Sequence, residues 1–93
     1  MTVKYDPDFL QKLKKVDVRV RNHFKKAIAV FTRDPFNPEL NNHSLKREYT
    51  GYRSIDITND WRALYAEKTE GDDTVAYFVI FGTHDEFYKR SIN

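Results

Sequence analysis

The sequence contains no cysteine, which excludes disulfide bridges and thiolate metal ligands. It has only three glycines, and 40% of its 93 residues are apolar and 15% aromatic, a composition typical of a folded chain and not of a disordered one. Nowhere do about eighteen apolar residues run together, and the N-terminus has no apolar signal segment. We therefore expect one soluble, cytoplasmic domain over residues 1–93, with no membrane partner.

Positive charge is concentrated in the first third of the chain. Residues 1–33 hold nine Lys and Arg against three Asp, whereas residues 34–93 hold seven Lys and Arg against eleven Asp and Glu. Such a basic segment suits contact with a polyanion, but amphipathic helices also carry lysine on their solvent face. Charge alone leaves both interpretations open. The candidate contacts to nucleic-acid phosphates in this segment are Lys12, Lys15, Arg19, Lys25 and Lys26.

The first half of the sequence predicts a short strand and two helices. After a strand at residues 3–5, Asp6 and Pro7 form a helix start with an N-cap and a proline at the first helical position. Asp17 can cap a second helix, in which apolar residues recur at helical spacing up to Phe31. The Asp34-Pro35 pair ends it, because a residue before proline avoids the helical region. Two helices joined this tightly predict an antiparallel hairpin.

The second half changes to the two-residue period of strands. Residues 36–45 read as a loop, and residues 52–58 alternate, with Arg53 sharing the parity of the isoleucines and Ser54 the opposite one. Strands at residues 61–68 and 74–81 form a hairpin, and the second is apolar on both faces, as a central strand is. A short C-terminal piece follows. The order β-α-α-β-β-β predicts an α+β fold, with a helical hairpin on a mainly antiparallel sheet.

Three histidines are the candidates for proton transfer. His23 lies in a lysine-rich helix and is typical of a solvent-facing residue, whereas His43 lies in a loop that leads to the sheet and His84 follows the central strand. No pair of histidines has the spacing of a zinc site, and the sequence has no glycine-rich phosphate loop. We therefore expect no metal and no nucleotide cofactor.

His43 and His84 have polar and aromatic neighbours that would suit cleavage of RNA by its own 2′-hydroxyl. Imidazole can give or take a proton near neutral pH, arginine can hold phosphate oxygens, and an aromatic ring can stack on a base. The same residues have structural interpretations: an acid can cap a turn, the arginines can pair with acids of the sheet, and the aromatics can be core. Pattern alone does not decide between the functional and the structural interpretation of these residues, which are Asp56, Asp60, Arg53, Trp61, Arg62 and Tyr88.

Four stretches together carry a resemblance to a known family. They are HSLK (43–46), GYR (51–53), DWRALY (60–65) and GTHDEFY (82–88). With the β-α-α-β-β-β order, they resemble the RelE/ParE superfamily of toxins from type II toxin–antitoxin systems, and within it the YafQ branch. The resemblance covers most of the chain, although the helical third matches only in architecture.

The resemblance implies a function and a partner. YafQ-like toxins have a curved sheet that enters the ribosomal A site, where they cut mRNA without metal by 2′-hydroxyl attack, leaving a 2′,3′-cyclic phosphate. A cognate antitoxin and a bacterial or archaeal cytoplasm are implied as well. On the positions that match the pattern, His43 is assigned as base, His84 as acid, Asp60 as orienting or sharing the base role, and Tyr88 as stacking on the nucleotide. The expected phosphate contacts are Lys46, Arg53 and Arg62.

One position departs from the pattern: Asp56 stands where YafQ has a second sheet histidine. Asp56 could serve as a carboxylate base, but it would place negative charge beside a phosphate. Two alternatives of the same fold stay open. One is a ParE-like toxin that binds DNA gyrase, and the other is a catalytically weakened protein that binds an antitoxin.

Overall fold

The structure is a computed structural model that describes the backbone of residues 1–91 and the side chains of residues 1–87. Strand β1 (Thr2–Tyr5) is followed by helices α1 (Pro7–Lys15) and α2 (Val18–Arg33). The 3-10 helix η1 (Pro38–Leu40) leads to strand β2 (His43–Ser44), and the 3-10 helix η2 (Arg47–Tyr49) leads to strand β3 (Arg53–Asp56). Strands β4 (Trp61–Glu70) and β5 (Asp73–Thr83) form a hairpin, and helix α3 (His84–Ser91) follows.

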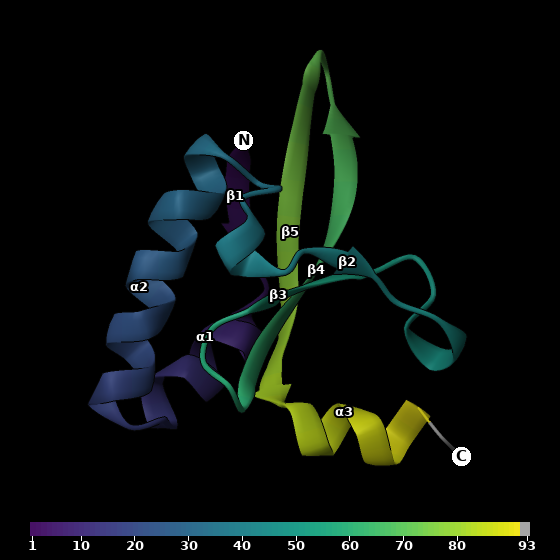
Figure 1. Ribbon diagram of the computed structural model, residues 1–93. Coiled ribbons are helices and arrows are strands. Elements are labelled where there is room, and N and C mark those ends of the chain that lie inside the picture. The colour runs from purple at the N-terminus through teal and green to yellow at the C-terminus, as the bar shows by residue number, and fades with distance from the viewer. Residues whose placement is uncertain (92–93) are drawn as a thin grey trace.

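The strands form one mixed sheet in the order β1-β5-β4-β3-β2. Strand β1 is parallel to β5, and all other neighbours are antiparallel. The predicted α+β class is therefore confirmed, with two main helices packed on a mostly antiparallel sheet (Figure 1). Strand β5, apolar on both faces, pairs on both sides as predicted, and the far end of the β4–β5 hairpin projects beyond the helices (Figure 1).

The two long helices begin at the predicted caps. The Asp6 carboxylate accepts a hydrogen bond from the Asp8 N–H at 2.8 Å, and the Asp17 carboxylate accepts one from the Arg19 N–H at 2.7 Å. Each bond satisfies a main-chain donor that has no partner within the helix. Helix α2 ends at Arg33, directly before the Asp34-Pro35 pair. No helix in the described part of the chain is long and apolar enough to cross a membrane.

An aromatic core joins the helices to one face of the sheet. Phe9 of α1 and Phe24 and Phe31 of α2 are buried against the sheet, and the rings of Phe31 and Phe78 meet edge-on at 5.3 Å between centroids. Such ring pairs add to the free energy gained from apolar burial. The sheet contributes Ile55, Ala63, Tyr65, Ala76, Phe78 and Phe81 to the same cluster, and Ile57 joins it from the turn after β3. The helices thus occupy one sheet face, and the side chains of opposite parity face the other way.

The segment between α2 and β3 is more ordered than the sequence predicts. Residues 36–45, expected as a loop, contain η1 and β2, and the strand expected at 52–58 is confined to Arg53–Asp56. It ends early because the N–H groups of Ile57 and Thr58 both bond to the Trp61 carbonyl, closing a turn. The predicted C-terminal piece is helix α3.

Removing one ring from the core tests its contribution to stability. Phe31 is fully buried, and we expect Phe31→Ala to lower the free energy of unfolding by about 3–5 kcal/mol because a cavity replaces the ring. Urea denaturation followed by circular dichroism measures the loss. Phe36, 61% exposed and stacked on Arg53, is the control, and Phe36→Ala should cost about 0.5–1 kcal/mol. Equal losses would contradict this description of the core.

Candidate active site

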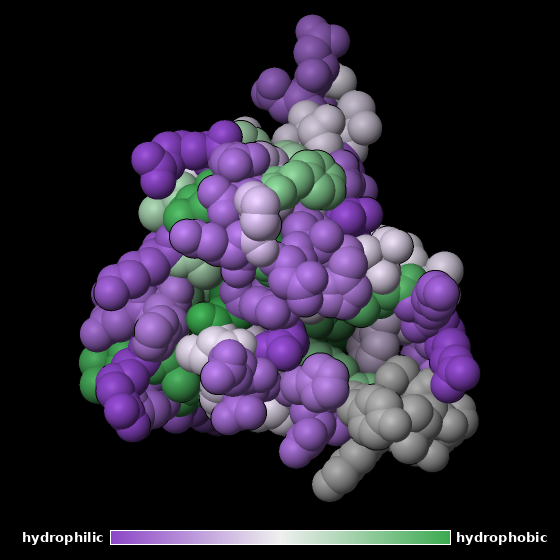
Figure 2. All heavy atoms as spheres, in the orientation of Figure 1, coloured by the Kyte–Doolittle hydropathy of each residue, from purple (hydrophilic) through white to green (hydrophobic). Residues whose placement is uncertain are grey.

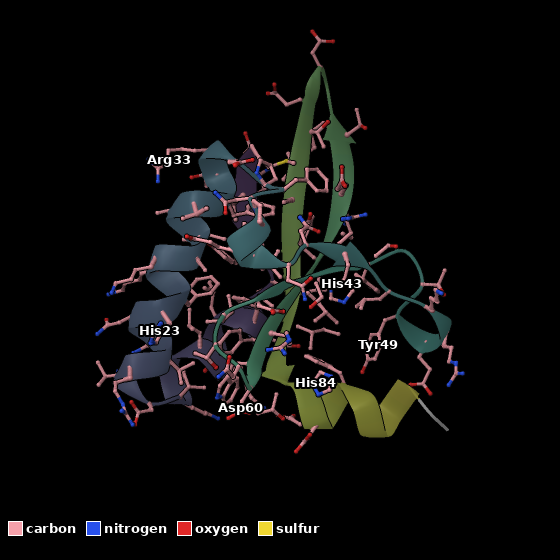
Figure 3. All side chains as sticks on the ribbon, in the orientation of Figure 1. His23, Arg33, His43, Tyr49, Asp60 and His84 are labelled. Atoms are coloured by element: carbon pink, nitrogen blue, oxygen red, sulfur yellow. The ribbon has the colours of Figure 1, made fainter. Side chains whose placement is uncertain are left out.

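A pocket of about 590 Å³ lies between β2, η2 and the start of α3. Both His43 and His84 line it (Figure 3). Ser54 of β3 and Arg62 of β4 line it as well, so residues from five elements meet there. His23, by contrast, lies on α2, away from the other two histidines (Figure 3). The remaining lining residues are Asn41, Leu45, Lys46, Arg47, Tyr49 and Phe87.

The pocket is basic on its polar side and apolar on its floor. Two imidazoles, one lysine and two arginines line it, and none of the described lining residues carries a carboxylate. In the space-filling view, hydrophilic residues surround a hollow with hydrophobic surface inside it (Figure 2). This combination favours an anionic group attached to a flat or apolar body, as in a nucleotide.

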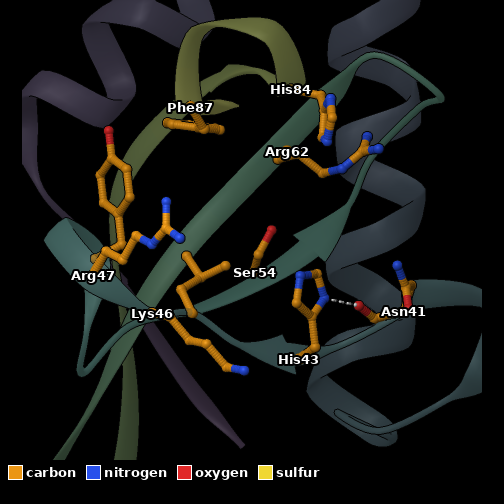
Figure 4. Close-up of a pocket in the computed structure, with 10 residues that line it drawn as sticks. Asn41, His43, Lys46, Arg47, Ser54, Arg62, His84 and Phe87 are labelled. Carbon is orange, nitrogen blue, oxygen red and sulfur yellow. Dashed lines mark hydrogen bonds between the residues drawn. The ribbon is translucent and has the colours of Figure 1, made fainter. Parts of the chain in front are cut away.

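A bond to a main-chain carbonyl orients the His43 ring. Nδ1 of His43 lies 2.8 Å from the carbonyl oxygen of Asn41 (Figure 4). The Asn41 backbone is in the left-handed conformation, with a φ of 48°. Because a carbonyl only accepts hydrogen bonds, Nδ1 carries the proton in this contact. In the neutral ring Nε2 is then the unprotonated nitrogen, as a proton acceptor requires.

The loop that carries His43 is anchored by its neighbour Asn42. The Asn42 amide donates to the Tyr65 hydroxyl at 2.7 Å and to the Pro35 carbonyl at 2.8 Å, and its oxygen accepts from Nε of Arg53 at 2.8 Å. Burial raises the pKa of the Tyr65 phenol, so this hydroxyl stays neutral at physiological pH. Strands β3 and β4 and the segment after α2 are thereby tied to the residue before His43.

A capping box places His84 at the first position of α3. The Thr83 hydroxyl accepts from the Glu86 N–H at 3.2 Å, and a Glu86 carboxylate oxygen accepts from the Thr83 N–H at 3.1 Å. The His84 N–H donates to the Asp60 carbonyl at 2.6 Å, which joins the helix start to the β3–β4 turn. The sequence TxxE at 83–86 contained this signal.

Helix α3 is held over the sheet by close packing as well. The Phe87 ring meets Tyr49 of η2 edge-on at 5.6 Å between centroids, and a Cβ added to Gly82 would lie 3.0 Å from that ring. Nζ of Lys12 lies 3.6 Å from Glu86 Oε2, linking α1 to α3. Glycine at 82 thus lets Phe87 approach the end of β5.

Arg62 enters the pocket from β4 with its guanidinium held in place. Its Nε lies 3.0 Å from Asp56 Oδ1, and Nη1 donates to the carbonyls of Thr58 at 2.7 Å and Trp61 at 3.1 Å. An arginine pairing with an acid of the sheet was one of the alternatives that the sequence left open. Here the pairing and the position in the pocket occur together.

The structure brings some of the predicted site residues to the pocket and not others. His43, His84, Lys46 and Arg62 line it. Asp60 lies in a neighbouring groove with Asp17 and Trp61, so it reaches His84 through its main chain. Tyr88 lies in α3, but its side chain is outside the described part of the structure.

Two further predicted residues have structural partners in place of the expected site. Arg53 bonds to Asn42 and stacks on Phe36 at 5.1 Å, so it lies with the loop anchor and not among the pocket residues. Asp56 does not line the pocket and instead pairs with Arg62. Arg53, Asp56 and Asp60 are thus not among the described residues that line the pocket, and the roles predicted for them stay predictions.

The basic helical residues lie away from the pocket, on the elements that cover the opposite face of the sheet. Lys12 pairs with Glu86, and Nε of Arg19 lies 4.0 Å from Asp17 Oδ1. Lys15, Lys25 and Lys26 are exposed. Helices α1 and α2 therefore carry positive charge outside the pocket.

Sequence reasoning missed Arg47, which lines the pocket from the start of η2. Its φ of 59° is the left-handed conformation, which is uncommon for a residue other than glycine. Neither η2 nor this conformation has a local signal in the sequence. Strained main chain of this kind occurs disproportionately at functional sites.

The chain shares its fold with solved toxins. YafQ from E. coli strain BL21(DE3) superposes with a TM-score of 0.73 at 20% identity, over 92% of this chain and 96% of that one. The YoeB/ParE toxin from Agrobacterium tumefaciens gives 0.72 at 21% identity, over 90% and 99% of the two chains. The E. coli DinJ-YafQ toxin-antitoxin complex gives 0.68 at 21% identity, over 92% and 94%. The fold is thus that of small toxins of the RelE type.

The family is more specific than the fold. A family model described as the bacterial toxin of type II toxin-antitoxin system, YafQ, matches residues 1–89. The chain therefore belongs to the YafQ family of type II toxins. No curated protein sequence matches it.

The capping box at Thr83 makes a pH-dependent prediction. The hydrogen bond from the Thr83 N–H lowers the pKa of Glu86 below its ordinary 4.5. Because the carboxyl titrates lower in the folded state, its contribution to stability is present above that value and is lost as pH falls through the folded pKa. We expect Glu86→Gln to lower the melting temperature at neutral pH. The corresponding loss in the free energy of unfolding should be less than about 1 kcal/mol, because the carboxylate is 42% exposed.

Thermal denaturation at pH 7 and at about pH 3 measures this difference, which should become smaller at the lower pH. Glu48, an exposed glutamate of η2, is the control, and Glu48→Gln should leave the pH dependence unchanged. A Glu86→Gln effect of the same size at both pH values would contradict the assignment.

Proposed function

We propose that this toxin is a ribosome-dependent endoribonuclease that cuts mRNA in the pocket between β2 and α3. The observation that carries the proposal is that two imidazoles from distant parts of the chain share one basic pocket with Arg62. Transfer of a phosphoryl group to an internal 2′-hydroxyl needs a base, an acid and positive charge at the phosphate. The described pocket contains all three kinds of group (Figure 4).

His43 acts as the base in the proposed reaction. Its Nδ1 proton is engaged by the Asn41 carbonyl, which leaves Nε2 to take the proton of the 2′-hydroxyl. The 2′-oxygen then attacks the adjacent phosphorus and forms a new P–O bond. The cyclic 2′,3′-phosphate is the product on the upstream fragment.

His84 acts as the acid. As the bond between phosphorus and the 5′-oxygen breaks, His84 donates a proton to that oxygen, which leaves as the 5′-hydroxyl of the downstream fragment. The proposed role of Asp60 is to position His84 through its carbonyl, which holds the His84 N–H at 2.6 Å. The proposed role of Tyr88, four residues on in α3, is to stack on the nucleotide at the cut.

Arg62, Lys46 and Arg47 supply the positive charge. The phosphoryl oxygens gain negative charge in the transition state, and donors already aimed at them lower its free energy. The apolar floor formed by Leu45, Tyr49 and Phe87 suits the sugar or base of the same nucleotide. In this proposal the phosphate binds at the basic side of the pocket, and the sugar or base binds at the apolar floor.

The proposed partners are a ribosome carrying mRNA and a cognate antitoxin. Family membership and the similarity to the DinJ-YafQ toxin-antitoxin complex support the antitoxin. The basic surface of α1 and α2 supports contact with ribosomal RNA phosphates, which would position the toxin without reading sequence. Its residues are Lys12, Lys15, Arg19, Lys25 and Lys26.

The two pocket histidines allow a direct test of the reaction. We expect His43→Ala and His84→Ala each to slow mRNA cleavage on programmed ribosomes by about 10²- to 10⁴-fold, because each removes a proton-transfer group. His23, exposed on α2, is the matched control, and His23→Ala should cut at the unmodified rate. If both pocket variants cut at that rate, the assignment of His43 as base and His84 as acid is wrong.

Expression of the toxin alone in a bacterium separates the proposal from its rivals. Growth arrest with codon-spaced mRNA cuts, mapped from RNA 5′ ends, is the expected result. Arrest with DNA-damage signalling and intact mRNA would favour a gyrase-binding toxin, and absence of arrest would favour an inactive antitoxin-binding protein.

The basic helices predict a salt-dependent affinity for ribosomes. Each neutralised phosphate contributes a slope of about −0.7 to −0.9 in the logarithm of affinity against the logarithm of salt concentration. We expect Lys25→Ala with Lys26→Ala to reduce the steepness by about 1 to 2, measured by sedimentation with ribosomes. Lys68, which lies over the Tyr77 ring on the β4–β5 hairpin, is the control residue. An affinity that does not change with salt would leave these lysines as ordinary solvent-facing residues.

A further inference from the structure

An ion pair and two hydrogen bonds hold the guanidinium of Arg62 before any ligand is present. Nε faces Asp56 Oδ1 at 3.0 Å, and the two Nη1 bonds run to main-chain carbonyls of the β3–β4 turn. The side chain is only 16% exposed. Among the described residues, no hydrogen bond engages Nη2. The N–H donors of Nη2 are therefore available to a ligand in the pocket that Arg62 lines.

The register of the sheet places Asp56 where it can hold this arginine. Asp56 and Arg62 are directly opposite each other on β3 and β4, so their side chains lie on the same face. The other oxygen of Asp56 accepts from the Asn41 amide at 3.4 Å, which fixes the carboxylate from a second side. Asp56 itself does not line the pocket.

We propose that Asp56 is a positioning residue, which orients Arg62 so that its Nη2 edge meets a phosphate oxygen. This inference rests on the proposed function, and it replaces the role of carboxylate base for Asp56. A free arginine side chain loses rotamer freedom when it binds, whereas one already held by an acid and two carbonyls loses little. The acid thus acts on the phosphate through the arginine.

Two opposite effects of Asp56 on an anion make the inference testable. As a bare negative charge near the pocket, Asp56 would weaken phosphate binding, and its removal would strengthen it. As an orienting partner of Arg62, Asp56 would strengthen binding, and its removal would weaken it. Only the second effect requires Arg62.

Titration of the protein with inorganic phosphate, followed by the NMR signals of the His43 and His84 rings, measures both effects at the pocket. With Arg62 present, we expect Asp56→Ala to weaken phosphate binding by about 3- to 10-fold. In the Arg62→Ala background, Asp56→Ala should leave the affinity unchanged or raise it. The same change in both backgrounds would overturn the inference.

Cleavage kinetics give a second readout. We expect Asp56→Ala to lower kcat by about 10- to 100-fold with little change in KM, and Asp56→Asn, which keeps a side-chain oxygen beside Nε without the charge, to recover part of that loss. The pH–rate profile should keep its shape in both variants, because no titrating group of the reaction has been removed. Loss of one limb of the profile in Asp56→Asn would identify Asp56 as the base and overturn the inference. Asp72→Ala, at the exposed hairpin tip, is the control.

The two readouts separate failure of the inference from failure of the proposed function. Absence of mRNA cleavage by the unmodified toxin would sink the proposed function, while the phosphate titration would still decide whether Asp56 acts through Arg62. Cleavage that depends on both histidines, with an Asp56 effect independent of Arg62, would sink the inference alone.

Discussion

The main-chain oxygens of the β3–β4 turn hold the two groups on which the pocket depends. The Asp60 carbonyl accepts from the His84 N–H, and the carbonyls of Thr58 and Trp61 accept from Arg62 Nη1. The turn itself is closed by main-chain bonds from Ile57 and Thr58 to Trp61. A four-residue connection therefore sets the distance between an imidazole from the end of β5 and an arginine from β4. His84 is held here through its backbone N–H, whereas Arg62 is held through Nη1 of its side chain.

The division of the sheet into two faces explains why this pocket exists. Helices α1 and α2 cover one face with an aromatic cluster, and among the described residues α3 and the η2 loop cover part of the opposite face. Ser54 and Leu64, opposite each other on β3 and β4, are buried on that second face, and Ser54 forms part of the pocket wall. Incomplete cover on a small sheet leaves a hollow with an apolar floor, and basic side chains on the surrounding loops give it its charge.

Local signals in the sequence predicted most of the fold and part of the site. The caps at Asp6 and Asp17 and the apolar β5 are properties of a few adjacent residues, so they could be read directly. Arg53 has the same parity as Ile55 in β3, so the sequence already indicates that its side chain points away from Ser54 and from the pocket face. The anchoring role of Asn42 and the left-handed Arg47 depend on contacts with distant segments, and no local pattern encodes them.

The acid at position 56 changes how positive charge is arranged at the pocket. An unpaired arginine on β4 would be free to adopt many rotamers, and an unpaired aspartate on β3 would repel a phosphate. Opposite each other in the ladder, the two neutralise part of each other's charge and fix a common geometry. Net charge toward an anion is then supplied mainly by Lys46 and Arg47, and Arg62 contributes direction more than charge. A site with this division of roles depends on the register between β3 and β4, because a shift of one residue would turn either partner to the opposite face of the sheet.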